Sequence, residues 1–291
     1  MRRRAVLFST IAILALAVSG AVLAQRTPDW TEPFPPFRIA GNLYYVGSRG
    51  LASYLIATPE GNILINSSLD ANVPMIKTSI EKLGFKFSDT KILLISHAHA
   101  DHDAGSAMIK ESTGATYMVM DGDVPSVESG GKIDPVNGVR ASAPYTPTKV
   151  DRVLHDRDTV KLGGTVLVAH LTPGHTKGCT TWTMKVREGG RTYNVVIIGS
   201  PNVNPGYKLV NNPAYPRIAQ DYERMWRVLK SLPCDIFLGA HGDYFGLEEK
   251  YPRMKEGSPN PFIDPDGYKK YVAEKEKAFY AELAKQKAAG D

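Results

Sequence analysis

The spacing of hydrophobic residues changes along the chain, and the changes indicate its secondary structure. Short apolar runs separated by turn residues predict three strands, at residues 43–46, 53–56 and 63–65. Across 72–83 the apolar residues recur every three or four positions, which is typical of an amphipathic helix. Residues 92–95 are all apolar with no alternation, which predicts a strand that is buried on both faces.

The second part of the chain repeats this order of elements. Further strands are predicted at residues 116–120, 152–155, 165–171, 180–186, 193–198 and 236–238. Helices are predicted at residues 104–112, 218–229 and 266–287. Strands followed by helices in both halves predict an α/β fold, in which two sheets pack face to face with helices outside. No repeat or linker interrupts the chain, so we expect a single domain over 25–291.

The N-terminal segment 1–24 has the pattern of an export signal. Three arginines precede the almost wholly apolar run 5–18, and small or aliphatic residues at 22–24 suit a signal peptidase. We expect cleavage after Ala24, which leaves a periplasmic protein with no membrane attachment. A retained membrane anchor is the alternative, although the apolar run is shorter than the roughly 20 residues that a spanning helix needs.

Charge and cysteine content narrow the function classes. The formal net charge is +5, and loss of the three signal arginines leaves +2 with no basic run, so we expect no nucleic-acid partner. Two cysteines, Cys179 and Cys234, are too few for a disulfide-stapled scaffold. A bond between them and a pair of buried free thiols both remain open.

Metal-binding side chains gather directly after the buried strand 92–95, in the sequence His97-Ala98-His99-Ala100-Asp101-His102. Residues two apart point the same way in extended backbone, so His97 and His99 can share one ion. Asp101 and His102 come as the chain bends into the next helix, so they can hold a second ion. Imidazole and carboxylate ligands together are typical of zinc.

Two more histidines follow strand ends. His175 comes after the strand 165–171, and His241 comes after the strand 236–238. Small residues flank both, which lets the backbone approach a site. His155 and His170 lack this context and are not assigned to metal.

These motifs resemble the metallo-β-lactamase superfamily, with its His-x-His-x-Asp-His motif, a later Thr-Pro-Gly-His and a final Gly-x-His. The Pro-Gly-Tyr-Lys-Leu stretch at 205–209 and the Asn-Pro-Ala-Tyr-Pro stretch at 212–216 are similar to subclass B3 in particular. The resemblance covers nearly all of the chain after the signal. It implies an αββα sandwich of two mixed β-sheets with helices on the outer faces.

The resemblance also implies two zinc ions per chain and a set of ligands. The first ion would be held by His97, His99 and His175, and the second by Asp101, His102 and His241. The implied activity is hydrolysis of the β-lactam amide bond by a zinc-bound hydroxide, which confers antibiotic resistance.

The same resemblance implies roles around the substrate. Asp101 would orient the hydroxide, and Tyr207 would polarise the lactam carbonyl. The candidates for binding the substrate carboxylate are Ser200, Asn202 and Asn204. We expect the protein to act as a monomer.

Three residues depart from the family pattern. Asn66 stands where the superfamily usually has an aspartate beside the ligands, which predicts lower metal affinity. Asp103 adds a negative charge next to the motif. Tyr268 occupies the place of a cysteine that often pairs with the equivalent of Cys234.

Two other functions remain open. A lactonase or thioester hydrolase of the same fold would carry a carboxylate that bridges the metals after the strand 193–198, where this chain has Gly199-Ser200-Pro201. A zinc-binding protein without catalysis is the other, although two ions with three ligands each leave coordination positions open, as catalytic sites do.

Overall fold

The computed structural model describes residues 30–133, 144–255 and 257–290, so the expected signal 1–24 lies outside them. Within these ranges, seven strands form one sheet, in the spatial order β1 (Phe37–Ala40), β2 (Leu43–Tyr45), β3 (Tyr54–Thr58), β4 (Gly61–Ile65), β5 (Thr90–Leu94), β6 (Thr116–Met120) and β7 (Arg152–Leu154). The strands β1 to β4 are antiparallel, whereas β4 to β7 are parallel. This sheet is therefore mixed.

Five strands form the second sheet, in the order β12 (Ile236–Gly239), β11 (Arg191–Ile198), β10 (Thr180–Glu188), β9 (Thr165–Leu171) and β8 (Thr159–Leu162). Its strands are antiparallel except for the parallel pair β11 and β12. The second sheet is also mixed, as the family resemblance implied.

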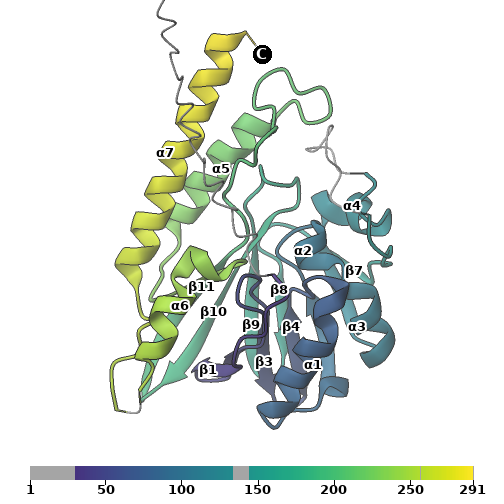
Figure 1. The fold of residues 1–291 in the computed structure, drawn as a ribbon, viewed down its shortest axis with the longest axis vertical. Helices are drawn as coiled ribbons and strands as arrows, with labels where there is room; N and C mark the ends of the chain where they lie inside the picture. Colours follow the sequence, from purple (N-terminus) through teal and green to yellow (C-terminus); the bar gives the residue numbers. More distant parts are fainter. Residues whose placement is uncertain (1–29, 134–143, 256, 291) are drawn as a thin grey trace, which may run out of the picture.

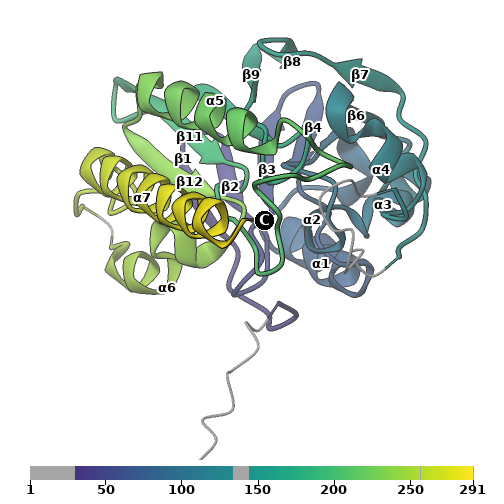
Figure 2. The same ribbon diagram turned by 90° about the horizontal axis from the view of Figure 1, so that it is seen from above.

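Helices cover the outer face of each sheet (Figures 1 and 2). Beside the first sheet lie α1 (Val73–Lys82), α2 (Ala100–Asp103), α3 (Ser106–Thr113) and α4 (Val124–Glu128). Beside the second lie α5 (Ile218–Ser231), α6 (Leu247–Lys250) and α7 (Pro265–Ala289). Figure 2 places α5 and α7 on one side of the strands and α1 to α4 on the other. The predicted αββα sandwich is confirmed.

The strand β5 explains why its sequence does not alternate. Ile92 and Leu94 belong to the core between the two sheets, whereas Leu93 and Ile95 belong to the core under α1 and α3. Both faces are apolar because both are covered. The carboxyl end of this strand is thereby held firmly where the histidine motif begins.

The helix α5 buries the face that its apolar spacing predicted. Tyr222, Met225 and Trp226 are almost fully buried. Phe279 of α7 packs against Tyr222, with ring centroids 5.0 Å apart, and against Trp226 at 6.1 Å. Such aromatic contacts add to the hydrophobic gain of burial, and they anchor α7 on the second sheet.

Some elements differ from the sequence expectations. The strand β8 and the short helices α4 and α6 were not predicted, because four or five residues carry too little periodicity. The helix expected at 104–112 begins at Ser106, and the separate turn α2 precedes it. Among the helices of the described ranges, none has the length and apolar content needed to cross a membrane.

Candidate metal centre

The six predicted ligands follow strand ends in both sheets, on loops or, for Asp101 and His102, in the short helix α2. His97, His175 and His241 come two to four residues after the ends of β5, β9 and β12. Backbone hydrogen bonds join these loops across the sandwich. The amide of Thr180 donates to Ser96 at 2.8 Å, and the amide of Ala52 donates to Ala240 at 3.0 Å. The ligands therefore converge because the edges of the two sheets are tied together.

The first group consists of His97, His99 and His175. All three rings are buried, and their ligand atoms lie within 4.8 Å of one another. Nε2 of His175 and Nδ1 of His99 are 3.1 Å apart. Three buried imidazoles that turn their nitrogens towards a common point are a suitable donor set for zinc.

The second group consists of Asp101, His102 and His241. Oδ2 of Asp101 lies 3.1 Å from Nε2 of His102 and 3.4 Å from Nε2 of His241, and the two Nε2 atoms are 3.1 Å apart. Tetrahedral donors at about 2.0 Å from zinc are themselves about 3.3 Å apart. The three donor atoms thus have the spacing of one face of a zinc coordination sphere.

His97 links the two groups. Its ligand atom also lies within 4.8 Å of those of Asp101 and His102. The rings of His97 and His102 have centroids only 4.3 Å apart. Two ions held by these groups would be close neighbours, as in binuclear hydrolytic sites.

The protonation states suit metal binding. Burial, together with the neighbouring imidazoles, lowers the pKa of His97 and His175 well below the usual value and that of His241 to about 3. Burial alone would raise the pKa of Asp101, but its neighbours His102 and His241 outweigh it and hold the pKa well below the ordinary range. At neutral pH these histidines keep free lone pairs and the carboxyl is ionised.

Two of the imidazoles are oriented by their other nitrogen. Nδ1 of His175 lies 2.8 Å from the carbonyl oxygen of Asn202, so Nδ1 carries the proton and Nε2 is left for a metal. Nδ1 of His97 lies 3.1 Å from the Ser96 hydroxyl. The carbonyl contact selects the tautomer of His175, and both contacts hold the direction of their rings.

Asn66 holds the start of the histidine motif. Its Oδ1 accepts a hydrogen bond from the Ser96 amide at 2.7 Å, and its Nδ2 donates to the Ala52 carbonyl at 3.1 Å. An aspartate could accept the first bond but could not donate the second. Asn66 also has a φ of 66°, in the left-handed region that asparagine tolerates well. The amide therefore suits this position better than a carboxylate would, and this geometry gives no reason for the lower metal affinity expected from the sequence.

Asp103 turns away from the cavity described below. Its Oδ1 accepts hydrogen bonds from the hydroxyls of Ser106, at 2.6 Å, and Tyr117. Burial raises its pKa to about 6. This residue belongs to the packing between α2, α3 and β6.

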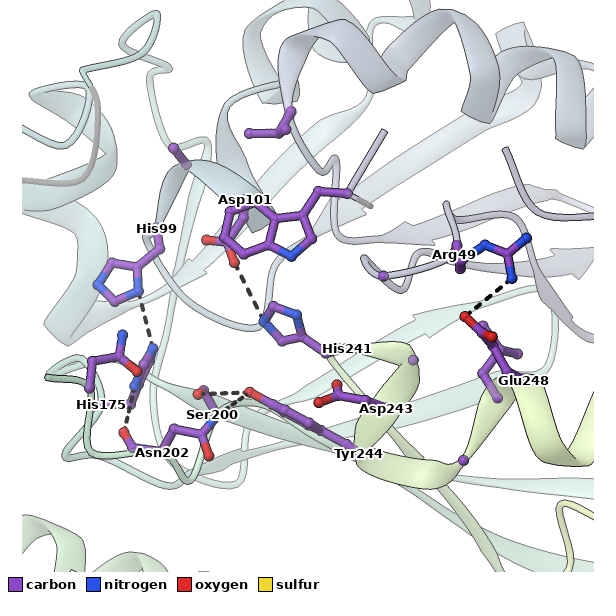
Figure 3. A pocket seen from close by; sticks show the side chains of 18 of the residues that line it. Arg49, His99, Asp101, His175, Ser200, Asn202, His241, Asp243, Tyr244 and Glu248 are labelled. Carbon is purple, nitrogen blue, oxygen red and sulfur yellow. Dashed lines mark hydrogen bonds and ion pairs between the residues drawn. The ribbon is translucent and has the colours of Figure 1, made fainter. Parts of the chain in front are cut away.

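A cavity of about 800 Å³ opens beside the two groups (Figure 3). Four of the six ligands line it, namely His99, Asp101, His175 and His241. Trp30, Leu69 and Leu247 add apolar surface. Arg49, which pairs with Glu32 at 2.5 Å and Glu248 at 3.2 Å, lies farther from the ligands (Figure 3). The site can accommodate a small organic molecule.

All three residues expected to bind a carboxylate line this cavity, namely Ser200, Asn202 and Asn204. The sequence reasoning missed Tyr244, whose hydroxyl joins two of them. Nδ2 of Asn202 donates to the Tyr244 hydroxyl at 2.7 Å, and Oγ of Ser200 lies 3.2 Å from it (Figure 3). The sequence could have pointed to Tyr244 through its position three residues after His241.

Tyr207 does not line the cavity. It is buried, its hydroxyl donates to the His175 carbonyl at 3.1 Å, and its ring lies 5.7 Å from the His175 ring. Its expected role of polarising a substrate carbonyl stays a prediction. Tyr207 supports the His175 loop because its hydroxyl is already committed to the backbone there.

The remaining histidines and cysteines lie outside both groups. His155 is exposed near Asp121, and Nε2 of His170 contacts the Thr183 hydroxyl at 2.9 Å. Cys179 and Cys234 are free, with Cys179 buried and Cys234 half-buried, so the alternative of a disulfide between them is not realised. Tyr268, at the other family departure, is buried and donates to the Leu229 carbonyl at 2.6 Å.

The fold and the site together define a class of protein, a metal-dependent αββα sandwich with two adjacent ligand groups at one edge of its sheets. The comparisons with known proteins name the family. Residues 48–188 match the metallo-β-lactamase superfamily. The native FEZ-1 metallo-β-lactamase from Legionella gormanii is 63% identical, with a TM-score of 0.87, and the match covers 88% of this chain and 98% of that one.

Two further solved structures are similar over almost their whole length. BJP-1, a subclass B3 metallo-β-lactamase of Bradyrhizobium japonicum, is 40% identical with a TM-score of 0.84, over 90% of this chain and 98% of that one. LRA-12, a class B3 di-zinc metallo-β-lactamase from an Alaskan soil metagenome, is 39% identical with a TM-score of 0.82, over 88% and 97%. The chain belongs to the metallo-β-lactamase superfamily, and its relatives include subclass B3 enzymes.

Proposed function

We propose that this protein is a zinc-dependent β-lactamase of the subclass B3 type, which opens the amide bond of the β-lactam ring and so confers resistance to these antibiotics. The observation that carries the proposal is the convergence of six side chains into two adjacent ligand groups beside a cavity. Relatives up to 63% identical are metallo-β-lactamases by name, which supports the same activity here.

Each ligand group fits one zinc ion. We assign the first ion to His97, His99 and His175, because three buried imidazoles offer nitrogen donors within 4.8 Å of one another. We assign the second to Asp101, His102 and His241, whose donor atoms are 3.1–3.4 Å apart. When bound, zinc ions supply a water of lowered pKa and a Lewis acid for a carbonyl oxygen.

Asp101 is the one carboxylate in the two ligand groups found among the described residues. It lines the cavity and is ionised at neutral pH, so it can both hold an ion and orient the attacking water by accepting its hydrogen bond. In the reaction the water adds its oxygen to the lactam carbonyl carbon, the carbon–nitrogen bond breaks, and a proton goes to the ring nitrogen. No protein nucleophile is required.

The substrate carboxylate would lie against the wall formed by Ser200, Asn202, Asn204 and Tyr244. This wall presents hydroxyl and amide donors at the side of the cavity next to His175 and His241. Asn202 has a second task, because its carbonyl oxygen orients His175. Asn202 would therefore both contact the substrate and orient the metal ligand His175.

Export and assembly complete the proposal. The pattern of segment 1–24 supports a cleaved signal and a periplasmic location, where β-lactams reach their targets. We propose a monomer over 25–291. Cell fractionation of the full-length chain, with the N-terminus of the product determined, tests cleavage after Ala24, and recovery of uncut chain in the membrane would contradict it.

The test of function is purification of residues 25–291, a zinc count, and hydrolysis of a chromogenic cephalosporin with and without a chelator. We expect about two zinc ions per chain and turnover that chelation abolishes. A parallel panel of a lactone and a thioester separates the alternatives on this fold. Turnover of either of those with no β-lactam hydrolysis would contradict the proposal, and so would zinc retention with no turnover at all.

A further inference from the structure

Asp123 is a buried carboxylate that the proposed chemistry does not use. It ends the short 3-10 helix η3 (Asp121–Asp123) and stands at the N-cap position of α4, yet its side chain makes no capping hydrogen bond. An aspartate at an N-cap normally accepts from the first turn of its own helix. Here the side chain is 1% exposed and directed elsewhere.

The carboxylate joins the two loops that carry the first ligand group. Oδ2 accepts from the Ala98 amide at 2.9 Å and from the Thr176 hydroxyl at 2.8 Å. Oδ1 accepts from the Gly178 amide at 2.7 Å. Ala98 lies between His97 and His99, and Thr176 follows His175 directly. One oxygen atom is therefore shared by both ligand loops.

Two glycines allow the backbones to come close enough for this arrangement. A Cβ built on Gly122 would lie 2.5 Å from the backbone of Lys177, and one on Gly178 would lie 2.5 Å from the amide nitrogen of Asp123. Neither glycine has a positive φ, so the requirement is space and not backbone conformation. The loop at 121–123 thus packs backbone to backbone against the His175 loop.

Burying this carboxylate would be costly without donors, and the three hydrogen bonds offset that cost. All three donors belong to the ligand loops, and none belongs to α4. The arrangement therefore uses a charged group to set the distance between two loops from different sheets, where an apolar contact would have left that distance less defined.

We propose that Asp123 is a positioning residue for the first zinc site, which holds the pair His97 and His99 at the correct distance from His175. It touches neither the ion nor the substrate. The inference rests on the proposed function for the presence of zinc, but concerns how the ligands are arranged. Zinc binding by the wild-type chain tests the proposed function, and the ratio between variant and wild type tests the inference.

The substitution Asp123→Asn provides the test, made in residues 25–291. Asparagine keeps the size, but in either amide orientation its NH₂ faces a backbone N–H donor, so at least one link is lost. We expect the affinity for the first zinc ion, measured by competition with a chromophoric chelator, to fall about 10- to 100-fold. With cobalt in place of zinc, the visible absorption bands should also change, which a loss of stability alone would not cause.

Asp121→Asn is the matched control, because Asp121 lies in the same short helix and accepts from the Gly122 amide at 2.7 Å without touching a ligand loop. We expect wild-type zinc affinity and an unchanged cobalt spectrum. If Asp123→Asn does not fold, Thr176→Val decides, since it removes one link to Oδ2 and keeps the shape. Wild-type affinity and spectrum in the folded variant that is tested would overturn the inference.

Discussion

The two ligand groups are neighbours, yet they differ in charge and in burial. The first, His97, His99 and His175, contains only imidazoles, and its members are 1–6% exposed. The second contains the carboxylate of Asp101, and the side chains of Asp101 and His241 are 15% and 17% exposed on the cavity side. The first group contains no carboxylate and is the more buried of the two, whereas the second carries the charge of Asp101, although each group contributes two ligands to the lining of the cavity.

The difference indicates that the two groups hold their ions with different affinity. In the first group, a hydrogen bond between Ser96 and Nδ1 of His97 and one between the Asn202 carbonyl and Nδ1 of His175 hold the two rings in place. In the second group, a hydrogen bond to the Gly50 backbone supports His241, whereas Nδ1 of His102 is buried with no hydrogen-bond partner in the described part of the chain. A buried, prebuilt site of three imidazoles should hold its ion tightly. A more open site, with less support behind it, should release its ion first.

Stepwise removal of metal should give the largest effect. We expect a chelator to remove the second ion before the first, and activity to fall with the loss of the second ion because Asp101 then lacks its partner. Zinc counting by mass spectrometry alongside turnover measures both. Full activity with a single tightly bound ion would contradict the two-metal arrangement.

Asp101→Asn addresses the second group directly. The substitution keeps the size and removes the charge, so the second ion should be held more weakly and the water should lose its orienting partner. We expect kcat/KM to fall at least about 100-fold, or roughly 2.7 kcal/mol. The variant should stay folded and retain about one zinc ion, because the first group is unchanged.

His155→Ala is the control for that variant. The His155 ring is exposed and lies 3.4 Å from Asp121, which is not a ligand, so turnover should stay within a few-fold of wild type. Normal hydrolysis by Asp101→Asn together with a large loss in His155→Ala would show that the ligands are assigned wrongly.

Asn66→Ala addresses the support of the first group. It removes the acceptor of the Ser96 amide and the donor to Ala52, which together anchor the backbone before His97. We expect metal affinity to fall about 10-fold or more, measured by chelator competition. Asn66→Asp should recover part of this loss, because it restores the acceptor and not the donor. Equal affinities in all three proteins would contradict the anchoring role.

Tyr244→Phe should have the smallest effect. It removes the hydroxyl that accepts from Asn202 and contacts Ser200, and leaves the ring packed on His241. One neutral hydrogen bond is worth about 0.5–1.5 kcal/mol, so we expect KM to rise up to about tenfold with kcat nearly unchanged. Steady-state kinetics on a β-lactam measures this, and a fall in kcat with constant KM would place Tyr244 in the chemical step instead.

Much of the fold could be predicted because long elements carry their own signals. The apolar face of α5 and the unbroken apolar strand β5 were both visible, since each depends on the spacing of neighbouring residues. The missed elements β8, α4 and α6 are four or five residues long, which is too short for a periodic pattern to show. The hydrogen bond from the Tyr207 hydroxyl to the His175 carbonyl was not predicted, because a motif does not show which way a side chain points.

The sequence by itself determined the order of strands and helices and the identity of the candidate ligands, because short-range spacing and residue chemistry are local properties. Only the tertiary structure brings the ligands together, since it places His175 beside His99 and His241 beside Asp101 across two sheets. It also decided that Asp123 serves the ligand loops and not its own helix. Such links join residues far apart in the chain, so they follow from packing and leave no pattern in the neighbouring sequence.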